Sequence, residues 1–365
     1  MRVLDTTSFK LHSGDEAKFR EEGYAILSHR WGASEITFKE IENHDEELKN
    51  GAPPLRPPLE KIRGACSSSV EEAESINSMF KWYCNAKLCI VYLQDVKKDD
   101  NIPTTDCKIF NQIGEDKPSE WFYRGWMLQE TLAPSDMEFY DTNWAYFGTK
   151  TDLKNALERI TGIPERYLTG LKDFRKAPIA AKMSWMAGRN TAKEEDIAYS
   201  MVGLFGLTMT IQYGEGYRAY LRLQEILLTS ERMDESIFAW KMPNENAGND
   251  YNGEVESWTP GDWGLLAPSP NWFKNSGNLI VKKSETRRFA KTGRGVEGPF
   301  VMHFLTSGIS TAYYGGVGVG TLLGILPGIV AYICVRQTIS KRINGDLAFR
   351  LSCYEKNDKG KLKPL

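Results

Sequence analysis

Tyr123-Arg124-Gly125-Trp126-Met127-Leu128-Gln129-Glu130 mixes aromatic, apolar and charged residues, and Ala133-Pro134 follows shortly after it. Ser119-Glu120 supplies an N-cap and a negative first turn, and a proline disfavours helical geometry in the residue before it. The pattern therefore predicts a helix over residues 120–133, which carries a carboxylate among aromatic side chains.

Helical spacing determines which of these side chains share a face. Phe122, Trp126 and Glu130 fall at i, i+4 and i+8, whereas Leu128 and Leu132 point toward a core. Glu130 is therefore expected beside an indole. The alternative is a half-buried amphipathic helix whose Glu130 reaches water.

The chain has 365 residues, of which 41% are hydrophobic and 26% are charged, with a formal net charge of −2. This composition is typical of a globular protein with one large or two medium domains. Near-neutral charge without a long basic run leaves no electrostatic footprint for nucleic acid. Nucleic-acid binding is therefore excluded as the main role, and small ligands or protein partners remain.

The chain has six cysteines and four histidines, and neither set has the spacing of metal ligands. The cysteines form no C-x-x-C pair, so no metal site is predicted. The N-terminus lacks the basic and then apolar pattern of a signal peptide, so we expect reduced thiols and a cytoplasmic protein.

An apolar strand is predicted at Tyr24-Ala25-Ile26-Leu27-Ser28, and it ends abruptly in His29-Arg30-Trp31-Gly32. In open α/β sheets, ligands bind just beyond the carboxyl ends of strands, so Ser28, Arg30 and Trp31 are candidate ligand-binding residues. Arg30 can hold a phosphate with two hydrogen bonds, and Trp31 can stack on a ring. A surface arginine and a packing tryptophan are equally consistent with the sequence.

The first 150 residues alternate strand and helix signals, as expected for an α/β domain with a short, largely parallel sheet. Residues 70–85 open with a capping box and carry apolar side chains at helical spacing. Residues 88–93 form a continuous apolar run of the kind that a parallel sheet buries. Two further short strands are predicted at residues 137–140 and 144–147.

Beyond residue 150 the pattern becomes helical, and residues 151–235 are expected to form a helical extension. Helices are predicted at residues 153–160, 179–187 and 217–228, and after a capping box at Thr191. Ser236-Ile237-Phe238-Ala239-Trp240 and Asn278-Leu279-Ile280-Val281 have the pattern of strands between loops rich in Gly, Asn and Pro. Residues 236–304 and 345–365 are therefore predicted to form a small β-rich region.

Residues 305–343 are rich in glycine and apolar side chains, and no charged residue occurs between His303 and Arg336. The stretch from Val317 to Val335 is long and apolar enough for a transmembrane helix, and its glycines recur at the spacing that lets membrane helices pack closely. The basic residues that follow oppose this topology, since positive charge prefers the cytosolic side. A buried hairpin or a poorly specified segment is the alternative.

Several stretches, taken in order, resemble the motifs of the fungal heterokaryon incompatibility (HET) domain. They are Tyr24-Ala25-Ile26-Leu27-Ser28-His29-Arg30-Trp31-Gly32, Ile76-Asn77-Ser78-Met79-Phe80-Lys81-Trp82-Tyr83 and Arg124-Gly125-Trp126-Met127-Leu128-Gln129-Glu130. Later stretches resemble the segment that follows this domain in vegetative incompatibility proteins, namely Ala187-Gly188-Arg189-Asn190-Thr191, Glu195-Asp196-Ile197-Ala198-Tyr199-Ser200 and Tyr213-Gly214-Glu215-Gly216. The resemblance, which covers roughly residues 1–240, implies a filamentous fungal protein of non-self recognition. Such a protein helps to trigger programmed cell death when unlike hyphae fuse, or serves in innate-type defence.

HET domains are distantly similar to Toll/interleukin-receptor (TIR) domains, in which a strand ending in Ser is followed by a helix whose Glu serves NAD glycohydrolysis. The matching positions are Ser28 and Glu130, so the resemblance implies that Glu130 is catalytic and that NAD is a substrate rather than a cofactor. Departure of nicotinamide leaves positive charge on the ribose, which a carboxylate stabilises. Arg30 would then hold the diphosphate, and Trp31 or Trp126 would stack on a ring.

One departure from the family pattern concerns the stretch after Cys66, which runs straight into Ser67-Ser68-Ser69. The family usually has an extra strand and an acidic loop there. Their absence predicts an incomplete sheet and an altered copy of the family. It favours the alternative function, which is a non-catalytic domain that self-associates or binds a protein partner through the same surface.

Overall fold

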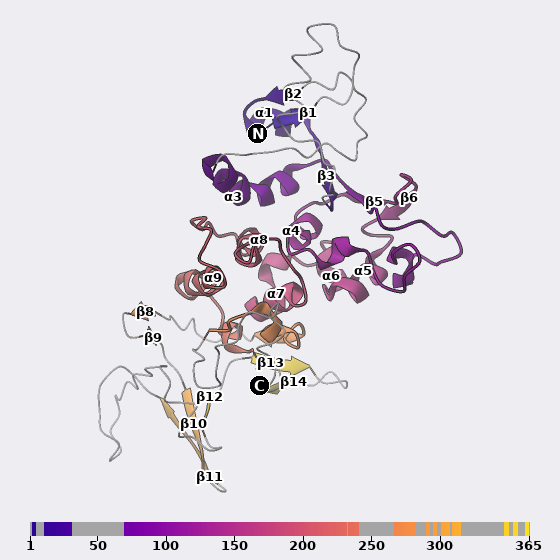
Figure 1. Cartoon of the computed structure of the whole chain (residues 1–365). Coiled ribbons are helices and arrows are strands. Elements are labelled where there is room, and N and C mark those ends of the chain that lie inside the picture. Colours follow the sequence, from indigo (N-terminus) through magenta and orange to yellow (C-terminus); the bar gives the residue numbers. More distant parts are fainter. Residues whose placement is uncertain are drawn as a thin grey trace, which may run out of the picture. The chain divides into compact units, whose positions relative to one another are not determined.

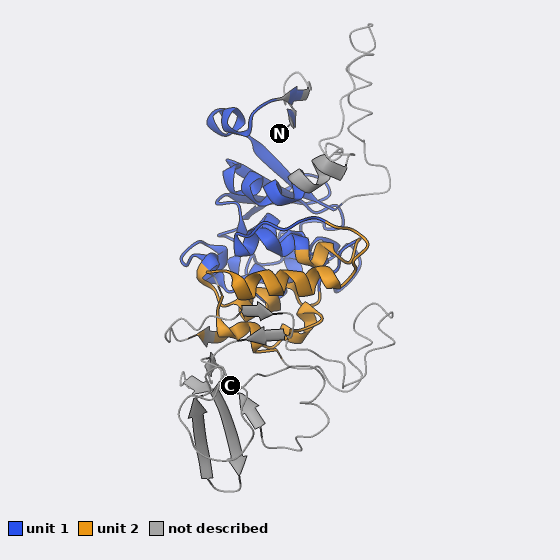
Figure 2. Ribbon diagram, turned by 90° about the vertical axis from the view of Figure 1, so that its left-hand side faces the viewer, with its two compact units in different colours: residues 1–175, 189–192, 199–211 blue, residues 176–188, 193–198, 212–365 orange. Residues whose placement is uncertain are grey.

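The computed structural model describes residues 2–4, 11–30, 69–231, 233–240 and 266–281, together with short strands between residues 290 and 364. The chain divides into two compact units (Figure 2). Unit 1 comprises residues 1–175, 189–192 and 199–211, and unit 2 comprises residues 176–188, 193–198 and 212–365. The chain therefore passes from one unit to the other several times before residue 212.

Unit 1 is built on a four-stranded sheet with the strand order β3-β4-β5-β6 (Figure 1). The strands are β3 (Ala25–His29), β4 (Leu88–Tyr92), β5 (Met137–Tyr140) and β6 (Tyr146–Thr149). β3, β4 and β5 are parallel, and β6 is antiparallel to β5. The predicted α/β domain with a largely parallel sheet is confirmed, although the last strand begins two residues later than predicted. β3 pairs directly with β4, so the described sheet is continuous without the family's extra strand.

The other described elements of unit 1 are helices and one small strand pair. The α-helices whose described residues lie entirely in unit 1 are α1 (Glu16–Glu22), α3 (Ser69–Asn85), α4 (Met127–Leu132), α5 (Lys154–Thr161) and α6 (Glu165–Leu168). Short 3-10 helices are η2 (Cys107–Phe110) and η3 (Glu120–Tyr123), and β1 (Arg2–Leu4) pairs with β2 (Leu11–Ser13). α3 and α5 fall where helical spacing predicts them.

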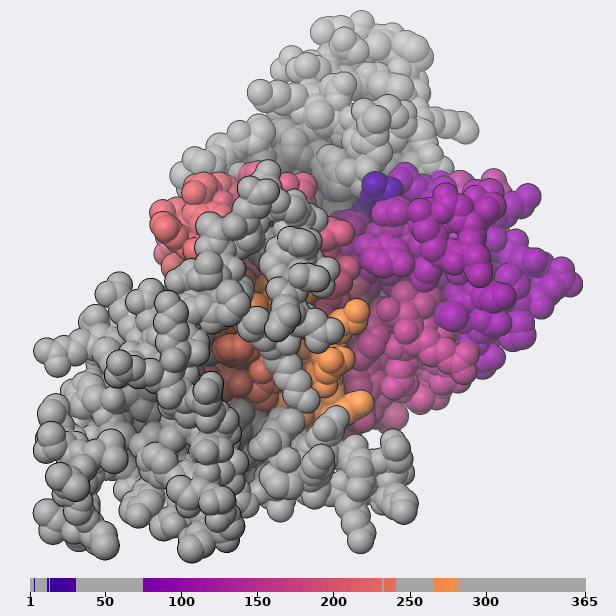
Figure 3. All heavy atoms as spheres, turned by 60° about the horizontal axis from the view of Figure 1, so that its bottom comes forward, coloured from indigo at the N-terminus to yellow at the C-terminus, as the bar shows by residue number. Residues whose placement is uncertain are grey.

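The core of unit 1 is aromatic. Phe110, Trp121, Phe122, Phe139 and Phe147 are all at most 5% exposed. Their rings meet edge to face, with centroids between 5.0 and 6.0 Å apart, which is the geometry that aromatic quadrupoles favour. In the space-filling view, the purple segments of unit 1 form one continuous stretch of surface (Figure 3).

The predicted continuous helix over residues 120–133 is wrong, because the chain breaks between η3 and α4. Arg124 is extended, with φ −77° and ψ 135°. The cause lies far away in sequence: the Gly125 N–H donates to the Asn190 carbonyl (2.8 Å), and the Asn190 N–H donates to the Tyr123 carbonyl (2.7 Å). Phe122 therefore does not continue the face of α4. Leu128 and Leu132 are buried in the core as predicted.

α8 (Asp196–Phe205) begins later than the Thr191 capping box predicts, and its last residues belong to unit 1. Gly203 on this helix lies against α3. A Cβ at Gly203 would lie 2.4 Å from the Cβ of Phe80, so only glycine permits this approach. The distant helices α3 and α8 thus pack backbone to side chain.

Unit 2 contains α7 (Ile179–Met186) and α9 (Arg218–Thr229) near their predicted positions. The predicted strand at residues 236–240 is wrong, because the segment forms the 3-10 helix η5 (Glu235–Phe238). Asp234 is the N-cap of η5, and its carboxylate accepts the N–H groups of Ser236 (2.9 Å) and Ile179 (3.0 Å). These bonds draw the backbone into a turn that a strand could not make.

The remaining described elements are short. η7 spans Pro270–Phe273, and the strands are β7 (Leu279–Val281), β8 (Ala290–Thr292), β9 (Gly295–Glu297), β10 (Val301–Thr306), β11 (Ile309–Tyr314), β12 (Leu347–Phe349), β13 (Cys353–Lys356) and β14 (Leu362–Pro364). The predicted strand at residues 278–281 is confirmed as β7, which pairs with β13. Among the described helices, none has the length and apolar character that crossing a membrane requires. Residues 317–335 lie outside the described part of the chain.

Candidate functional site

Ser28 and Glu130 meet, although they are 102 residues apart in the sequence. Ser28 is the fourth residue of β3, and Glu130 lies in the middle of α4. The Ser28 hydroxyl donates to Oε2 of Glu130 at 2.7 Å, and both residues are 0% exposed. Glu130 is thus fully buried, and the alternative in which it reaches water is wrong.

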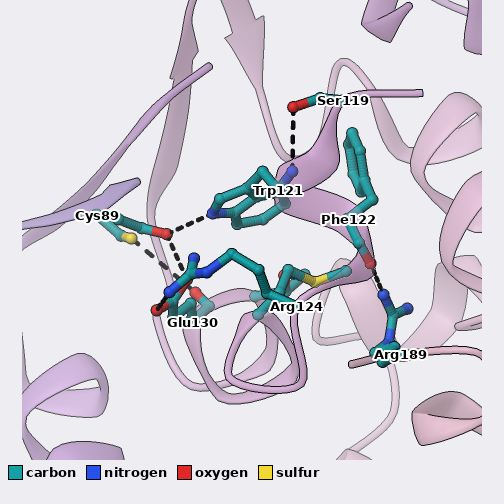
Figure 4. Close-up of polar contacts among 10 residues, drawn as sticks. Cys89, Ser119, Trp121, Phe122, Arg124, Glu130 and Arg189 are labelled. Atoms are coloured by element: carbon teal, nitrogen blue, oxygen red, sulfur yellow. Dashed lines mark hydrogen bonds and ion pairs between the residues drawn. The ribbon is translucent and has the colours of Figure 1, made fainter. Parts of the chain in front are cut away.

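Trp121 fixes the direction of this hydrogen bond. Its indole N–H donates to the Ser28 hydroxyl oxygen at 2.9 Å (Figure 4). An indole nitrogen can only donate, so the Ser28 oxygen accepts and its own hydrogen is directed at Glu130. Register supports the arrangement, since Ser28 aligns with Val91 and Val91 with Phe139, against which the Trp121 ring packs.

Arg124 pairs with Glu130 through two parallel hydrogen bonds. Nη1 of Arg124 donates to Oε2 at 2.9 Å, and Nη2 donates to Oε1 at 3.1 Å. Glu130 therefore accepts three hydrogen bonds, and its charge is matched by a guanidinium in the strong bidentate geometry. The Arg124 side chain is 18% exposed, more than any other member of the cluster of Ser28, Trp121, Arg124 and Glu130.

Arg189 and Asn190 hold the backbone that presents Arg124. The Arg189 guanidinium donates to the carbonyl of Phe122 (Figure 4). It also donates to the carbonyl of Thr161 at 3.2 Å, and burial lowers the pKa of Arg189 to about 10. Together with the Asn190 bonds to Tyr123 and Gly125, these contacts fix η3 and the break after it. The stretch around Arg189 thereby positions the earlier stretch around Arg124.

The other candidate residues lie differently. The Arg30 side chain is 50% exposed, and its guanidinium is 4.0 Å from Glu120. Trp31 lies outside the described residues. Trp126 is half-buried, and its carbonyl accepts the N–H of Glu130 at 3.2 Å. The indole that is linked to Glu130 through Ser28 is that of Trp121, which sequence spacing did not single out.

Gln129, which precedes Glu130 in the sequence, is a further polar residue, and the sequence pattern indicates no role for it. It is 1% exposed, and its amide N and O make no hydrogen bond to any residue in the described ranges. A buried amide without partners costs about 1–3 kcal/mol for each unsatisfied group. Gln129 is therefore a candidate binding residue, although on a different face of α4 from Glu130, because neighbouring residues of a helix do not face each other.

Parts of the remaining motifs, namely Glu195, Asp196 and the stretch from Tyr213 to Gly216, come together in unit 2. The Glu195 carboxylate accepts the N–H groups of Gly214 (2.7 Å) and Gly216 (2.9 Å). Burial alone would raise the pKa of Glu195, but the hydrogen bonds from these glycines hold it below its usual range. Both glycines have positive φ, which explains why the motif needs glycine there. Asp196 lies in the first turn of α8, as predicted, and accepts the Tyr213 hydroxyl at 3.0 Å.

Lys150 stabilises the carboxyl end of α4. Its ammonium donates to the carbonyls of Thr131 (3.0 Å) and Pro134 (2.6 Å), and the residue is 6% exposed. A cation at a helix C-terminus matches the helix dipole. Burial nevertheless lowers the pKa of Lys150 to about 8.

This pKa predicts a pH dependence of stability. The folded state releases the Lys150 proton near pH 8, whereas the unfolded state keeps it to about 10.5. Between these values the unfolded state binds more protons, so stability rises with pH. Relative to Lys150→Met, the free energy of unfolding of the wild type should increase by about 2 kcal/mol between about pH 7.5 and 9.5. Urea denaturation at both pH values measures this, and a constant difference would contradict it.

No protein-family model and no solved structure matches the chain. The four-stranded, largely parallel sheet and its helices define an α/β domain, and over part of its length the chain is similar to a fungal vegetative incompatibility protein. The relative is the vegetative incompatibility protein HET-E-1 of Podospora anserina, to which the chain is 36% identical over 224 residues. The match covers 55% of this chain but 16% of HET-E-1, so the chain spans a small part of that protein's length. The predicted resemblance is thereby confirmed, while its TIR-like part stays a prediction.

Proposed function

We propose that the chain is a cell-death signalling module that acts in fungal vegetative incompatibility or innate-type defence. The observation that supports this role is the sequence match to HET-E-1, which extends over 224 residues. Expression in a filamentous fungus tests the proposal, and death of the expressing hyphae is the expected result. Normal growth at high expression would contradict it.

A finer proposal is that the module is TIR-like and hydrolyses NAD at Glu130. In this reaction the bond between the ribose and the nicotinamide nitrogen breaks, and its electron pair leaves with nicotinamide, which becomes neutral. Water bonds to the ribose carbon and loses a proton. Glu130 would stabilise the positive charge on the ribose, with Ser28 and Trp121 holding one carboxylate oxygen in place.

The second candidate function is a non-catalytic interaction module that self-associates or binds a protein partner. The Arg124–Glu130 pair favours it, since a carboxylate that is fully buried and matched by a guanidinium has no charge left for a substrate. In this view the cluster around Glu130 is structural. The catalytic reading requires Arg124 to leave Glu130 first.

Incubation of the purified chain with NAD separates the two candidates. Release of free nicotinamide that scales with protein concentration is expected for the enzyme, and Glu130→Gln serves as the matched control. Inertness at high protein concentration, together with self-association measured by light scattering, would support the interaction module instead.

A further inference from the structure

We infer that the Arg124–Glu130 pair is a recognition site for a ligand that carries both a phosphoryl anion and a cationic ring. The guanidinium turns from the carboxylate to the phosphoryl group, and the ring takes its place beside Glu130. This inference deepens the proposed function and rests on it, because a pyridinium dinucleotide has both groups.

Exposure indicates which member of the pair moves. Ser28 and Glu130 are 0% exposed and Trp121 is 1% exposed, whereas the Arg124 side chain is 18% exposed. Arg124 is therefore the member that an incoming ligand meets first. Arg124 also lies in the extended break between η3 and α4 and so belongs to neither helix.

The surrounding contacts allow the side chain to move without the backbone. The Asn190 bonds to Tyr123 and Gly125 clamp the chain on both sides of Arg124. Glu130 keeps the hydrogen bond from Ser28, whose hydroxyl is oriented by Trp121. Only the guanidinium has to turn, and Glu130 stays in place.

Charge balance selects the ligand. Withdrawing Arg124 alone leaves Glu130 buried without a counter-ion, which is strongly unfavourable. An anionic ligand would satisfy Arg124 but not Glu130, and a cation would displace Arg124 without giving it a partner. A ligand with both charges replaces each half of the ion pair. The planar fork of Arg124 also suits two oxygens of a phosphoryl group.

This assignment moves the diphosphate contact from Arg30 to Arg124. The Arg30 side chain is half-exposed and stands near Glu120, where solvent weakens its interactions. Arg124 is mostly buried and is already held in bidentate geometry.

Calorimetric titration of the full chain with three ligands tests the inference. The ligands are carba-NAD, which carries the pyridinium ring but resists hydrolysis, NADH, whose ring is neutral, and ADP-ribose, which lacks the ring. We expect carba-NAD to bind about tenfold or more tightly than NADH, and Glu130→Gln to remove that preference. Arg124→Lys, which keeps the charge but loses the fork, should weaken carba-NAD about tenfold.

Arg20→Lys on the exposed surface of α1 is the matched control and should bind as the wild type does. The double variant Arg124→Gln/Glu130→Gln removes both charges at once and should unfold at a temperature close to that of the wild type. Loss of binding in this variant therefore reflects the missing charges and not misfolding. Equal binding of carba-NAD and NADH, unchanged carba-NAD binding in Arg124→Lys, or no binding of any ligand would overturn the inference. Nicotinamide release without these patterns would refute the inference but leave the proposed enzyme. The expected binding patterns without nicotinamide release would leave a binding site without catalysis.

Discussion

Under the proposed NAD hydrolysis, replacing Glu130 by glutamine is expected to lower nicotinamide release by about two to three orders of magnitude, because the variant keeps the size of the side chain but loses the charge that would stabilise a cationic transition state. Toxicity on overexpression should be lost in parallel. The measurement is single-turnover release of nicotinamide by the purified wild type and variant at equal concentration.

Burial changes what is expected of folding in this variant. A solvated helix residue would tolerate the change with about half a kcal/mol or less. Glu130 is instead fully buried and bonded to Ser28 and Arg124, so Glu130→Gln should lower the free energy of unfolding by about 1–3 kcal/mol. Activity must therefore be compared where both proteins are folded. Toxicity that survives Glu130→Gln but is lost on Trp126→Ala would contradict catalysis and favour the interaction module.

Removing Arg124 should have the largest effect on stability. Arg124→Met leaves the Glu130 charge buried without its counter-ion, and breaking such a pair costs about 3–5 kcal/mol. Partial exposure of Arg124 places the expected loss toward the lower end. Chemical denaturation monitored by tryptophan fluorescence measures it.

A double-mutant cycle provides the control. Adding Glu130→Gln to Arg124→Met removes the uncompensated charge, so the double variant should recover most of the lost stability. Additive losses in the double variant would mean that the two side chains do not stabilise each other. In that case the close geometry of the pair would have no energetic consequence.

The parallel strands could be predicted because their signals are local. Residues 88–93 form a continuous apolar run of the kind that a parallel sheet buries, and polar residues follow the apolar run that ends at Ser28. Pairing Ser28 with Glu130 needed the family resemblance, since no spacing rule links residues so distant. The structure then gives the pair a geometry that the resemblance did not contain.

Arg124 and Trp121 were missed for a physical reason. In a continuous helix, residues six apart point about 120° away from each other, so Arg124 could not reach Glu130. The break that brings Arg124 to Glu130 is caused by hydrogen bonds to Asn190, and no local sequence pattern near Arg124 predicts them. The strand predicted from residue 236 fails partly for a similar reason. The Asp234 carboxylate caps η5 locally by accepting the Ser236 N–H, and it also accepts the N–H of the distant Ile179.

The interrupted course of the chain through unit 1 has a consequence for how such genes can recombine. Residues 189–192 return to unit 1 after residues 176–188 have contributed to unit 2. A crossover between paralogues at residue 150 would keep Trp121, Arg124 and Glu130 from one parent but take Asn190 from the other. Chimaeras of that kind should retain the cluster around Glu130 only when the two parents present the same backbone at Asn190. A breakpoint beyond residue 211 would transfer the whole unit.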